Sequence, residues 1–236
     1  MAEIKGILFD KDGTLVDFDA TWFAVGDMLA LHTAGGDRAR ANELLDLAGY
    51  DFDTQRFRPD SVFAAGTNEE MVALWHPGLD ARGRSEALAQ FERIVTAEGS
   101  AKPVALPGCR DALSVLHGRG LRMGVATNDS TSGAERTLAF LGIAQMFEAA
   151  YGYDAVANPK PAPDTLYAFC DLTGLKPAQV AMVGDNRHDL QMARAGGAGL
   201  SIGVLSGTGT VESLSPLADV VLGSIVDLPG FLAAGS

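Results

Sequence analysis

Cysteine is scarce in this chain, since Cys109 and Cys170 are the only two among 236 residues. Two thiols far apart do not make a disulfide framework, which excludes a small disulfide-stapled fold and favours a reducing compartment. Long apolar runs are also missing, because no stretch approaches the roughly 20 residues that span a bilayer. The first residues, MAEIKG, lack the basic and apolar segments of a signal peptide. We therefore expect a cytoplasmic protein with no membrane contact.

Basic residues are in short supply as well. Lysine and arginine total 18 against 30 aspartates and glutamates, which gives a net charge of −12 at pH 7. This balance argues against a nucleic-acid partner. If the ligand is an anion, cations must be supplied locally at its site. Hydrophobic residues make up 47% of the chain, which is enough for a globular core.

The chain does contain a series of short apolar runs that end at turn signals, which is typical of buried strands. Helical patterns followed by glycine separate most of these runs. Strands that alternate with helices predict an α/β fold, with a parallel sheet covered on both faces. The predicted strands are Ile4–Phe9, Leu121–Ala126, Phe147–Tyr151, Val180–Val183, Gly199–Val204 and Val220–Leu222. The predicted helices are Ser130–Leu141, Pro163–Thr173, Asp189–Ala195 and, from a weaker pattern, Ile225–Leu232.

The segment between the first and second predicted strands has a different sequence pattern. Strand-like runs are absent, and most apolar residues recur at helical spacing. Its helical stretches are Asp19–Thr33, Asp37–Ala48, Asn68–Trp75 and Arg84–Glu98. The stretch from Tyr50 to Pro59 is polar and irregular. From Lys102 to Gly108, prolines disfavour helix and predict an extended linker.

These patterns predict two domains. Residues 1–16 and 103–236 form an α/β core, and residues 17–102 form an inserted helical domain. An insert that leaves the core at the carboxyl end of a strand is well placed to cover a site there.

The first predicted strand runs into two carboxylates, in the sequence Asp10-Lys11-Asp12-Gly13-Thr14. In an extended chain Asp10 and Asp12 point to the same side, and Lys11 is expected to point away as a bystander. Neighbouring carboxylates raise each other's pKa unless a cation intervenes, and Mg²⁺ prefers such oxygen ligands. A solvated Asp-rich turn is the alternative interpretation.

Two later segments also place polar groups after strands or in stiff loops. Thr127-Asn128-Asp129-Ser130 stands at an expected helix N-terminus, which offers free N–H groups and a positive dipole to an anion. A simple helix cap would use the same residues. Lys160 stands between two prolines, which stiffen its loop and aim the ammonium group at little entropic cost. A surface lysine remains the alternative.

A second acidic pair, Asp185 and Asp189, follows the predicted strand Val180–Val183. Asp185 could complete a metal site begun by Asp10, and Asp189, one helical turn later, could orient a ligand or Lys160. An aspartate cap with a surface acid is the alternative. In α/β sheets ligands bind outside the carboxyl ends of the strands, where all these groups are expected to meet.

These segments, in this order and spacing, resemble the four motifs of the haloacid dehalogenase-like hydrolase superfamily. The matching residues are Asp10-x-Asp12-Gly13-Thr14, Thr127-Asn128, Lys160-Pro161 and Gly184-Asp185-x-x-x-Asp189. The stretch Phe9–Leu15 is similar to that of phosphoglycolate phosphatase-like members, which are Mg²⁺-dependent phosphatases. The resemblance implies a Rossmann-like core whose insert is an α-helical cap domain. One minor departure is Asn186, where Ser or Thr is common.

The resemblance also implies a mechanism. Asp10 would attack the phosphorus of a phosphomonoester and form an aspartyl-phosphate, while Asp12 would serve first as the acid and then as the base. Mg²⁺ would be held by Asp10, Asp185 and the backbone carbonyl of Asp12.

The remaining motif residues would bind the phosphoryl group. Its oxygens would contact Thr127, the N–H of Asn128 and Lys160, with Asp189 behind them. The acid at Asp12 favours a phosphatase or a phosphomutase, because the dehalogenases of the superfamily generally lack it.

The implied ligand is a small phosphorylated metabolite such as phosphoglycolate, selected by the cap. The cap cations considered are Arg56, Arg58, His76, Arg82 and Arg84, with Arg58 the first choice for a substrate carboxylate. A sugar phosphomutase is the closest alternative. Two alternatives belong to another class: a phospho-accepting regulatory module and a catalytically silent binding protein. A monomer and a homodimer are both compatible with the sequence.

Overall fold

The computed structural model describes residues 3–58, 61–65, 68–98 and 103–234. Within it the chain forms two compact units, one from Met1–Asp17 with Val104–Ser236 and the other from Phe18–Pro103. Pro59 and the start of the predicted linker at Lys102 lie outside the described residues.

The larger unit is built on a six-stranded sheet in the order β5-β4-β1-β6-β7-β8, in which every pair is parallel. β1 is central, and its Phe9 lies level with Val125 of β4 and Val183 of β6. The predicted α/β fold is confirmed, and the six predicted strands are all present with small shifts at their ends. They are β1 (Gly6–Phe9), β4 (Arg122–Ala126), β5 (Ala149–Tyr151), β6 (Val180–Gly184), β7 (Leu200–Val204) and β8 (Val220–Leu222).

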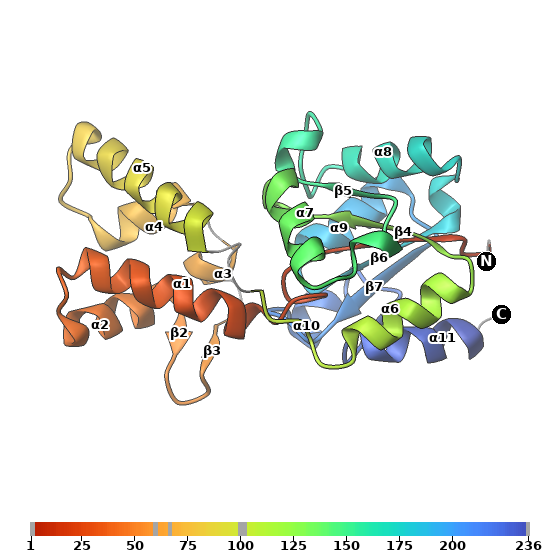
Figure 1. Cartoon of the computed structure of the whole chain (residues 1–236), viewed down its shortest axis with the longest axis horizontal. Helices are drawn as coiled ribbons and strands as arrows, with labels where there is room; N and C mark the ends of the chain where they lie inside the picture. Colours follow the sequence, from red (N-terminus) through yellow and green to blue (C-terminus); the bar gives the residue numbers. More distant parts are fainter. Residues whose placement is uncertain (1–2, 59–60, 66–67, 99–102, 235–236) are drawn as a thin grey trace. The chain divides into compact units, whose positions relative to one another are not determined.

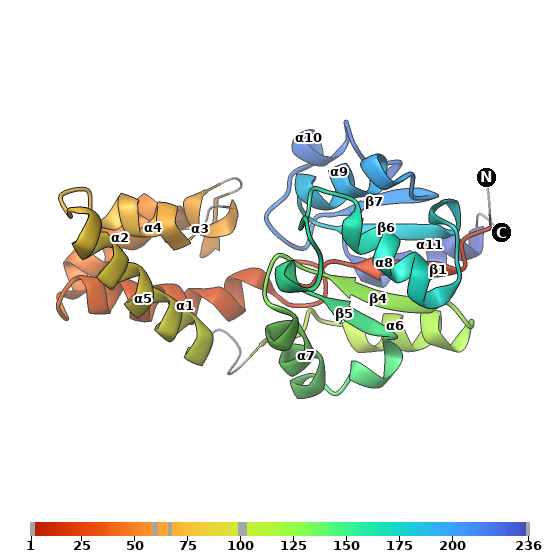
Figure 2. The same ribbon diagram turned by 90° about the horizontal axis from the view of Figure 1, so that it is seen from above.

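Helices cover both faces of this sheet (Figures 1 and 2). They are α6 (Cys109–Gly118), α7 (Thr131–Phe140), α8 (Asp164–Thr173), α9 (Arg187–Gly196), α10 (Val211–Leu214) and α11 (Leu228–Ala234). Short 3-10 turns occupy Ala144–Met146, Tyr153–Ala155, Pro177–Gln179 and Ile225–Asp227. The weak pattern predicted as one helix from Ile225 is therefore a 3-10 turn followed by α11.

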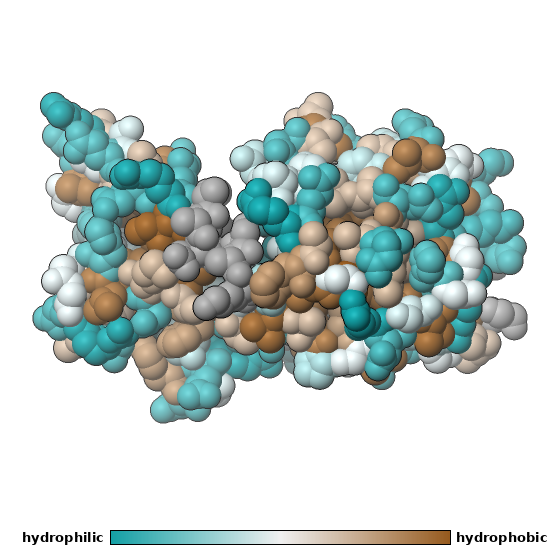
Figure 3. Space-filling model, in the orientation of Figure 1, coloured by the Kyte–Doolittle hydropathy of each residue, from teal (hydrophilic) through white to brown (hydrophobic). Residues whose placement is uncertain are grey.

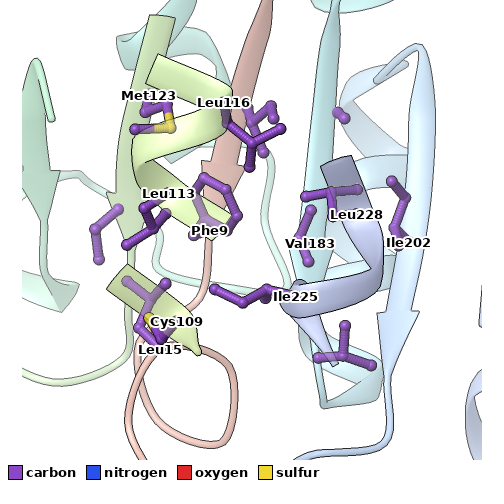
Figure 4. Packing of buried hydrophobic residues seen from close by; sticks show 14 of the residues in the cluster. Phe9, Leu15, Cys109, Leu113, Leu116, Met123, Val183, Ile202, Ile225 and Leu228 are labelled. Carbon is purple, nitrogen blue, oxygen red and sulfur yellow. The ribbon is translucent and has the colours of Figure 1, made fainter. Parts of the chain in front are cut away.

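The alternation of side chains along β1 explains why both faces need cover. Ile7 and Phe9 pack on one face with residues of α6, α7 and α11, and Figure 4 shows Phe9 beside Leu113 there. Leu8 packs on the other face with residues of α8 and α9, among them Phe169. Because both sides of the strand are buried, its sequence is continuously apolar rather than alternating.

The smaller unit is mainly helical. Its helices are α1 (Phe18–Thr33), α2 (Arg38–Ala48), α3 (Val62–Ala65), α4 (Asn68–Trp75) and α5 (Ala81–Glu98). They enclose a core of their own, in which Leu29, Leu45 and Trp75 are buried.

The expectation that this unit lacks strands is wrong in one place. Tyr50–Asp51 and Arg56–Phe57 pair as a short antiparallel hairpin, β2 and β3. The side chain of Asp51 accepts hydrogen bonds from two backbone N–H groups of the turn, and the rings of Tyr50 and Phe57 contact each other at 5.0 Å. Two-residue strands leave no alternation in the sequence, so the pattern could not show them.

Helix α9 begins at Arg187, two residues before the predicted start. Asn186 is the N-cap: its side chain accepts from the His188 N–H, and its own N–H donates to Asp189. The helix ends with Gly197 in the left-handed region (φ 72°), where glycine has no steric penalty. Asn186 thus performs at this cap the task that Ser or Thr performs elsewhere.

Some apolar side chains are exposed on the surface of the larger unit. Val115 of α6 and Phe140 of α7 are 46% and 60% exposed. Hydrophilic and hydrophobic residues are interspersed on the face shown in Figure 3. None of the helices in the described part of the chain combines the length and apolar character of a membrane span.

Candidate active site

The candidate residues lie at one edge of the sheet. β1, β4, β6 and β7 are parallel neighbours, so their carboxyl ends lie along the same edge (Figures 1 and 2). Asp10 directly follows β1, Thr127 follows β4, and Asp185 follows β6. The order of the strands therefore brings together segments that are far apart in the sequence.

A buried lysine forms the centre of the site. Lys160 Nζ donates to Asp10 Oδ1 and to Asp189 Oδ1, each at 2.6 Å. All three residues are buried, and so is Asp185. One carboxylate oxygen from each of Asp10, Asp185 and Asp189 lies within 4.8 Å of the others. The structure thus joins Lys160 to both acidic pairs.

The charges in this cluster do not balance. Burial raises the pKa of Asp10 to about 7, with Asp189 and Asp12 adding to the rise and Lys160 opposing it. Burial likewise raises the pKa of Asp185 well above its ordinary value, and the charges of Asp10 and Asp189 add to it. Burial alone would lower the pKa of Lys160, but Asp10 and Asp189 outweigh it and hold the pKa above its usual value.

One lysine therefore lies among three buried aspartates, so the cluster contains more acidic groups than basic ones. Carboxylate oxygens are the ligands that a hard divalent cation such as Mg²⁺ prefers. The donor set fits such an ion. Asp189 accepts from Lys160 with Oδ1 and from the Asn186 N–H with Oδ2. Asp10 and Asp185 are therefore the better candidates for metal ligands.

The loop after β4 is tied to the lysine. Asn128 Nδ2 donates to the backbone carbonyl of Lys160 at 3.1 Å. Thr127 is buried, and its Oγ1 accepts from the Asp129 N–H at 3.1 Å. Ser130 caps α7 by accepting from the Gly133 N–H. The segment is therefore a helix cap, as the alternative interpretation held, and it also contacts the lysine of the site.

The prediction that Lys11 points away is wrong. Its side chain is buried, and Lys11 Nζ lies 2.5 Å from Asp12 Oδ2 and 3.3 Å from Asp129 Oδ2. The alternation rule fails because β1 ends at Phe9 and the chain turns at once: Leu15 and Val16 both donate N–H groups to the Lys11 carbonyl. Thr14 Oγ1 in the same turn is buried without a hydrogen-bond partner among the described residues.

Sequence reasoning missed the segment Ser206–Thr210, which follows β7. The Thr208 N–H donates to Asp185 Oδ2 at 2.8 Å, and Ser206 Oγ donates to the Gly13 carbonyl at 2.7 Å. A Cβ added to Gly207 would lie 2.0 Å from Asp185 Oδ2. The available signal was the sequence Ser-Gly-Thr-Gly-Thr at the end of a predicted strand, where a ligand or another backbone often approaches.

Three of the five cations singled out in the smaller unit form ion pairs inside that unit. The side chain of Arg56 pairs with Asp19, and that of Arg58 pairs with Asp46. Arg82 pairs with Glu86 one helical turn away. Trp22 and Phe23 pack against the core of this unit, which is a structural role.

Fold and site together define a class: an α/β protein with a buried aspartate–lysine cluster at the carboxyl edge of a parallel sheet. Comparisons with known proteins identify the family. The sequence model of the haloacid dehalogenase-like hydrolase family matches residues 4–197.

Similar proteins agree with this match. The phosphoglycolate phosphatase of Escherichia coli K12 is 30% identical, in an alignment that covers 96% of this chain and 91% of that protein. That of Salmonella typhimurium is 31% identical, over 97% and 92% of the two chains. The crystal structure of a predicted phosphoglycolate phosphatase from Haemophilus somnus shares the fold, with a TM-score of 0.77 over 98% of this chain and 99% of the other at 22% identity.

This chain belongs to the haloacid dehalogenase-like hydrolase family. Within that family it groups with the phosphoglycolate phosphatase-like members, as its motifs indicated.

Proposed function

We propose that this hydrolase is a Mg²⁺-dependent phosphatase that cleaves a small phosphomonoester through an aspartyl-phosphate on Asp10. The chain is a phosphatase of its family; the metal, the intermediate and the substrate class are the proposal. The observation that carries it is Lys160, whose ammonium group lies 2.6 Å from both Asp10 and Asp189 in a buried cluster. Family membership sets aside the regulatory module considered from the sequence.

Asp10 and Asp185 would hold the cation with their side chains, and Asp12 with its backbone carbonyl. Mg²⁺ would neutralise negative charge on the transferring phosphoryl group and let the anionic substrate approach Asp10. Asp189 would orient Lys160, because both its oxygens already accept hydrogen bonds. In this arrangement the positive charge of the cation would offset the excess of carboxylates in the cluster.

Asp10 acts as the nucleophile in this proposal. Its Oδ1 accepts from Lys160, which leaves the other oxygen to attack phosphorus. The new bond joins Asp10 to phosphorus as the bond from phosphorus to the ester oxygen breaks, and Asp12 gives its proton to the departing alkoxide. Water then attacks the phosphorus and yields a proton to Asp12, which releases phosphate and restores Asp10.

The phosphoryl oxygens would be bound by Thr127 Oγ1, the N–H of Asn128 and the ammonium of Lys160. Donors fixed in advance stabilise the charge that develops in the transition state without reorganising. The bond from Asn128 to the Lys160 carbonyl supports this assignment, because it couples two of the three donors.

The substrate we propose is a small phosphorylated metabolite of the phosphoglycolate type, in a cytoplasmic setting, with the helical unit of residues 18–103 acting as the cap. The named activity of the relatives from Escherichia coli and Salmonella supports this class. A cap that encloses the reacting group would exclude bulk water during the first step.

The test is phosphate release from p-nitrophenyl phosphate and a panel of metabolites, each with Mg²⁺ and with EDTA. We expect hydrolysis with Mg²⁺, none with EDTA, and the highest kcat/KM on a small phosphorylated acid. Transfer of the phosphoryl group to a hexose phosphate instead of water would establish a phosphomutase. Equal rates with EDTA would refute the metal assignment.

A further inference from the structure

Lys11 is a buried cation for which the proposed chemistry has no use so far. Only 2% of the residue is exposed. Its Nζ lies 2.5 Å from Asp12 Oδ2 and 3.3 Å from Asp129 Oδ2. An ammonium group taken out of water destabilises the fold unless charged partners surround it. The two carboxylates therefore compensate for the burial of this charge.

The ammonium group of Lys11 is held between the carboxylates of Asp12 and Asp129. The backbone of Lys11 is fixed as well, because its carbonyl accepts from the N–H groups of Leu15 and Val16. The backbone carbonyl and the ammonium group of Lys11 are thus both held in place.

Lys11 joins two loops of the site. Asp12 belongs to the turn after β1, whereas Asp129 belongs to the loop between β4 and α7. Asp129 uses its second oxygen, Oδ1, to accept from the Ser130 N–H at 2.6 Å, next to the cap of α7. A continuous chain of polar contacts therefore runs from the first turn of α7 through Lys11 to the carboxylate of Asp12.

We propose that Lys11 is a positioning residue: held by Asp129, it fixes the Asp12 carboxylate in the direction needed to protonate the leaving group. The inference rests on the proposed function and deepens it, because it assigns to this chain the group that aims its acid. A rotatable aspartate side chain has several rotamers, and one buried cation bonded to Oδ2 selects among them.

The consequence depends on the leaving group. An alkyl phosphomonoester releases a strongly basic alkoxide, which must be protonated as the bond to phosphorus breaks. p-Nitrophenolate leaves without a proton. Misplacing the acid therefore slows phosphoryl transfer from alkyl esters and spares transfer from p-nitrophenyl phosphate. A loss of folded protein slows both equally.

The experiment compares kcat/KM of Lys11→Met and wild type on p-nitrophenyl phosphate and on the best alkyl phosphomonoester of the panel, because kcat/KM reports the steps up to phosphoenzyme formation. We expect a fall of about 100-fold on the alkyl ester, since general acid catalysis contributes about 10²- to 10⁴-fold, and less than about fivefold on the aryl ester. Lys5→Met, at an exposed lysine paired with Glu3, is the control and should change neither.

Two further variants keep the test decisive. Asp129→Asn removes the second anchor of Lys11 and should give the same selective loss in smaller measure, whether or not Lys11→Met folds. In an Asp12→Asn background, Lys11→Met should add no further selective loss, because the group it positions is already gone. Equal losses on both esters in Lys11→Met and Asp129→Asn, or no loss, would overturn the inference. The wild-type rates test the proposed function separately.

Discussion

At the scale of the residue, the side chain of Lys160 holds the candidate site together. Its ammonium group is the link between the carboxylates that follow β1 and β6, since Asp10 and Asp189 both accept from it. In the proposed reaction it holds Asp10 for attack and then helps to bind the phosphoryl group. Both tasks need a positive charge at one place, which a neutral side chain of similar length does not supply.

Lys160→Met should therefore lower kcat/KM on phosphomonoesters by about 10²- to 10³-fold, the usual effect of removing one fixed donor to a transition state. It should also lower the stability of the metal-free protein, because Asp10 and Asp189 lose the cation between them. Steady-state kinetics and thermal unfolding measure the two effects. Lys5→Met, at an exposed lysine, is the control. A kcat/KM of Lys160→Met within about threefold of wild type would exclude this role for Lys160.

Residue identities and their order along the chain were enough to predict which side chains would gather. Asp10, Asp185 and Asp189 meet because the carboxyl ends of the adjacent strands β1 and β6 share an edge, and Lys160 reaches Asp10 and Asp189 from the loop between β5 and α8. The direction of Lys11 could not be predicted in the same way. It depends on where β1 ends, and one residue of difference in a strand end reverses the side to which a side chain points.

At the scale of the element, the loop after β7 shapes the candidate metal site without supplying a charged group. Thr208 donates its backbone N–H to Asp185, and Gly207 lies against the same carboxylate. Backbone contacts of this kind carry no side-chain signature. Sequence could mark the glycines of this loop but could not say which carboxylate they approach.

Gly207→Ala should displace Asp185, because the added Cβ would lie 2.0 Å from its Oδ2 and 2.4 Å from its Cγ. We expect the apparent affinity for Mg²⁺ to fall about 10- to 100-fold, as when partners of metal ligands are disturbed. Activity measured across a Mg²⁺ titration gives this value. Gly118→Ala is the matched control, since nothing lies within 4 Å of its added Cβ. An unchanged Mg²⁺ midpoint in Gly207→Ala would show that the loop does not position Asp185.

The β2–β3 hairpin marks another limit at this scale. Long helices such as α1 and α2 were predicted near their true ends, whereas two-residue strands left no pattern. The hairpin forms because Asp51 closes the turn and aromatic side chains cover it, with Phe57 and Phe63 stacked at 4.3 Å. Such tertiary contacts decide short elements, and periodicity does not reveal them.

At the scale of the whole molecule, an acidic protein of net charge −12 concentrates buried carboxylates at one edge of its sheet. The sequence pattern changes from alternating strands and helices to helices alone. This change was enough to predict two units, because the two patterns differ in composition and period. We expect this acidic cluster to make the stability of the protein depend on pH and on metal.

The sign of that dependence follows from the raised pKa values. The pKa of Asp10 moves from 3.8 to about 7 on folding, and that of Asp185 is also raised. Between those values the folded protein holds protons that the unfolded chain has lost, so this contribution to stability declines as the pH rises to about 7. A divalent cation competes with the same protons and should stabilise most where they are absent.

Mg²⁺ should therefore raise the Tm more at about pH 8 than at about pH 5.5, relative to EDTA at the same pH. Thermal unfolding of wild type, Asp185→Asn and Asp111→Asn measures this. The effect should vanish in Asp185→Asn and persist in Asp111→Asn, whose side chain is exposed on α6. An equal rise at both pH values, or one that survives in Asp185→Asn, would contradict the assigned site.

The central claim is that Asp10 carries the phosphoryl group between substrate and water. The most direct measurement is an acid quench during turnover, followed by peptide mass spectrometry and by treatment with hydroxylamine, which cleaves acyl phosphates. The aspartyl-phosphate mechanism predicts a hydroxylamine-labile phosphoryl group on Asp10 that appears with substrate and Mg²⁺ and is absent from Asp10→Asn, which should not turn over. A phosphoryl group on another residue, or wild-type turnover by Asp10→Asn, would contradict it.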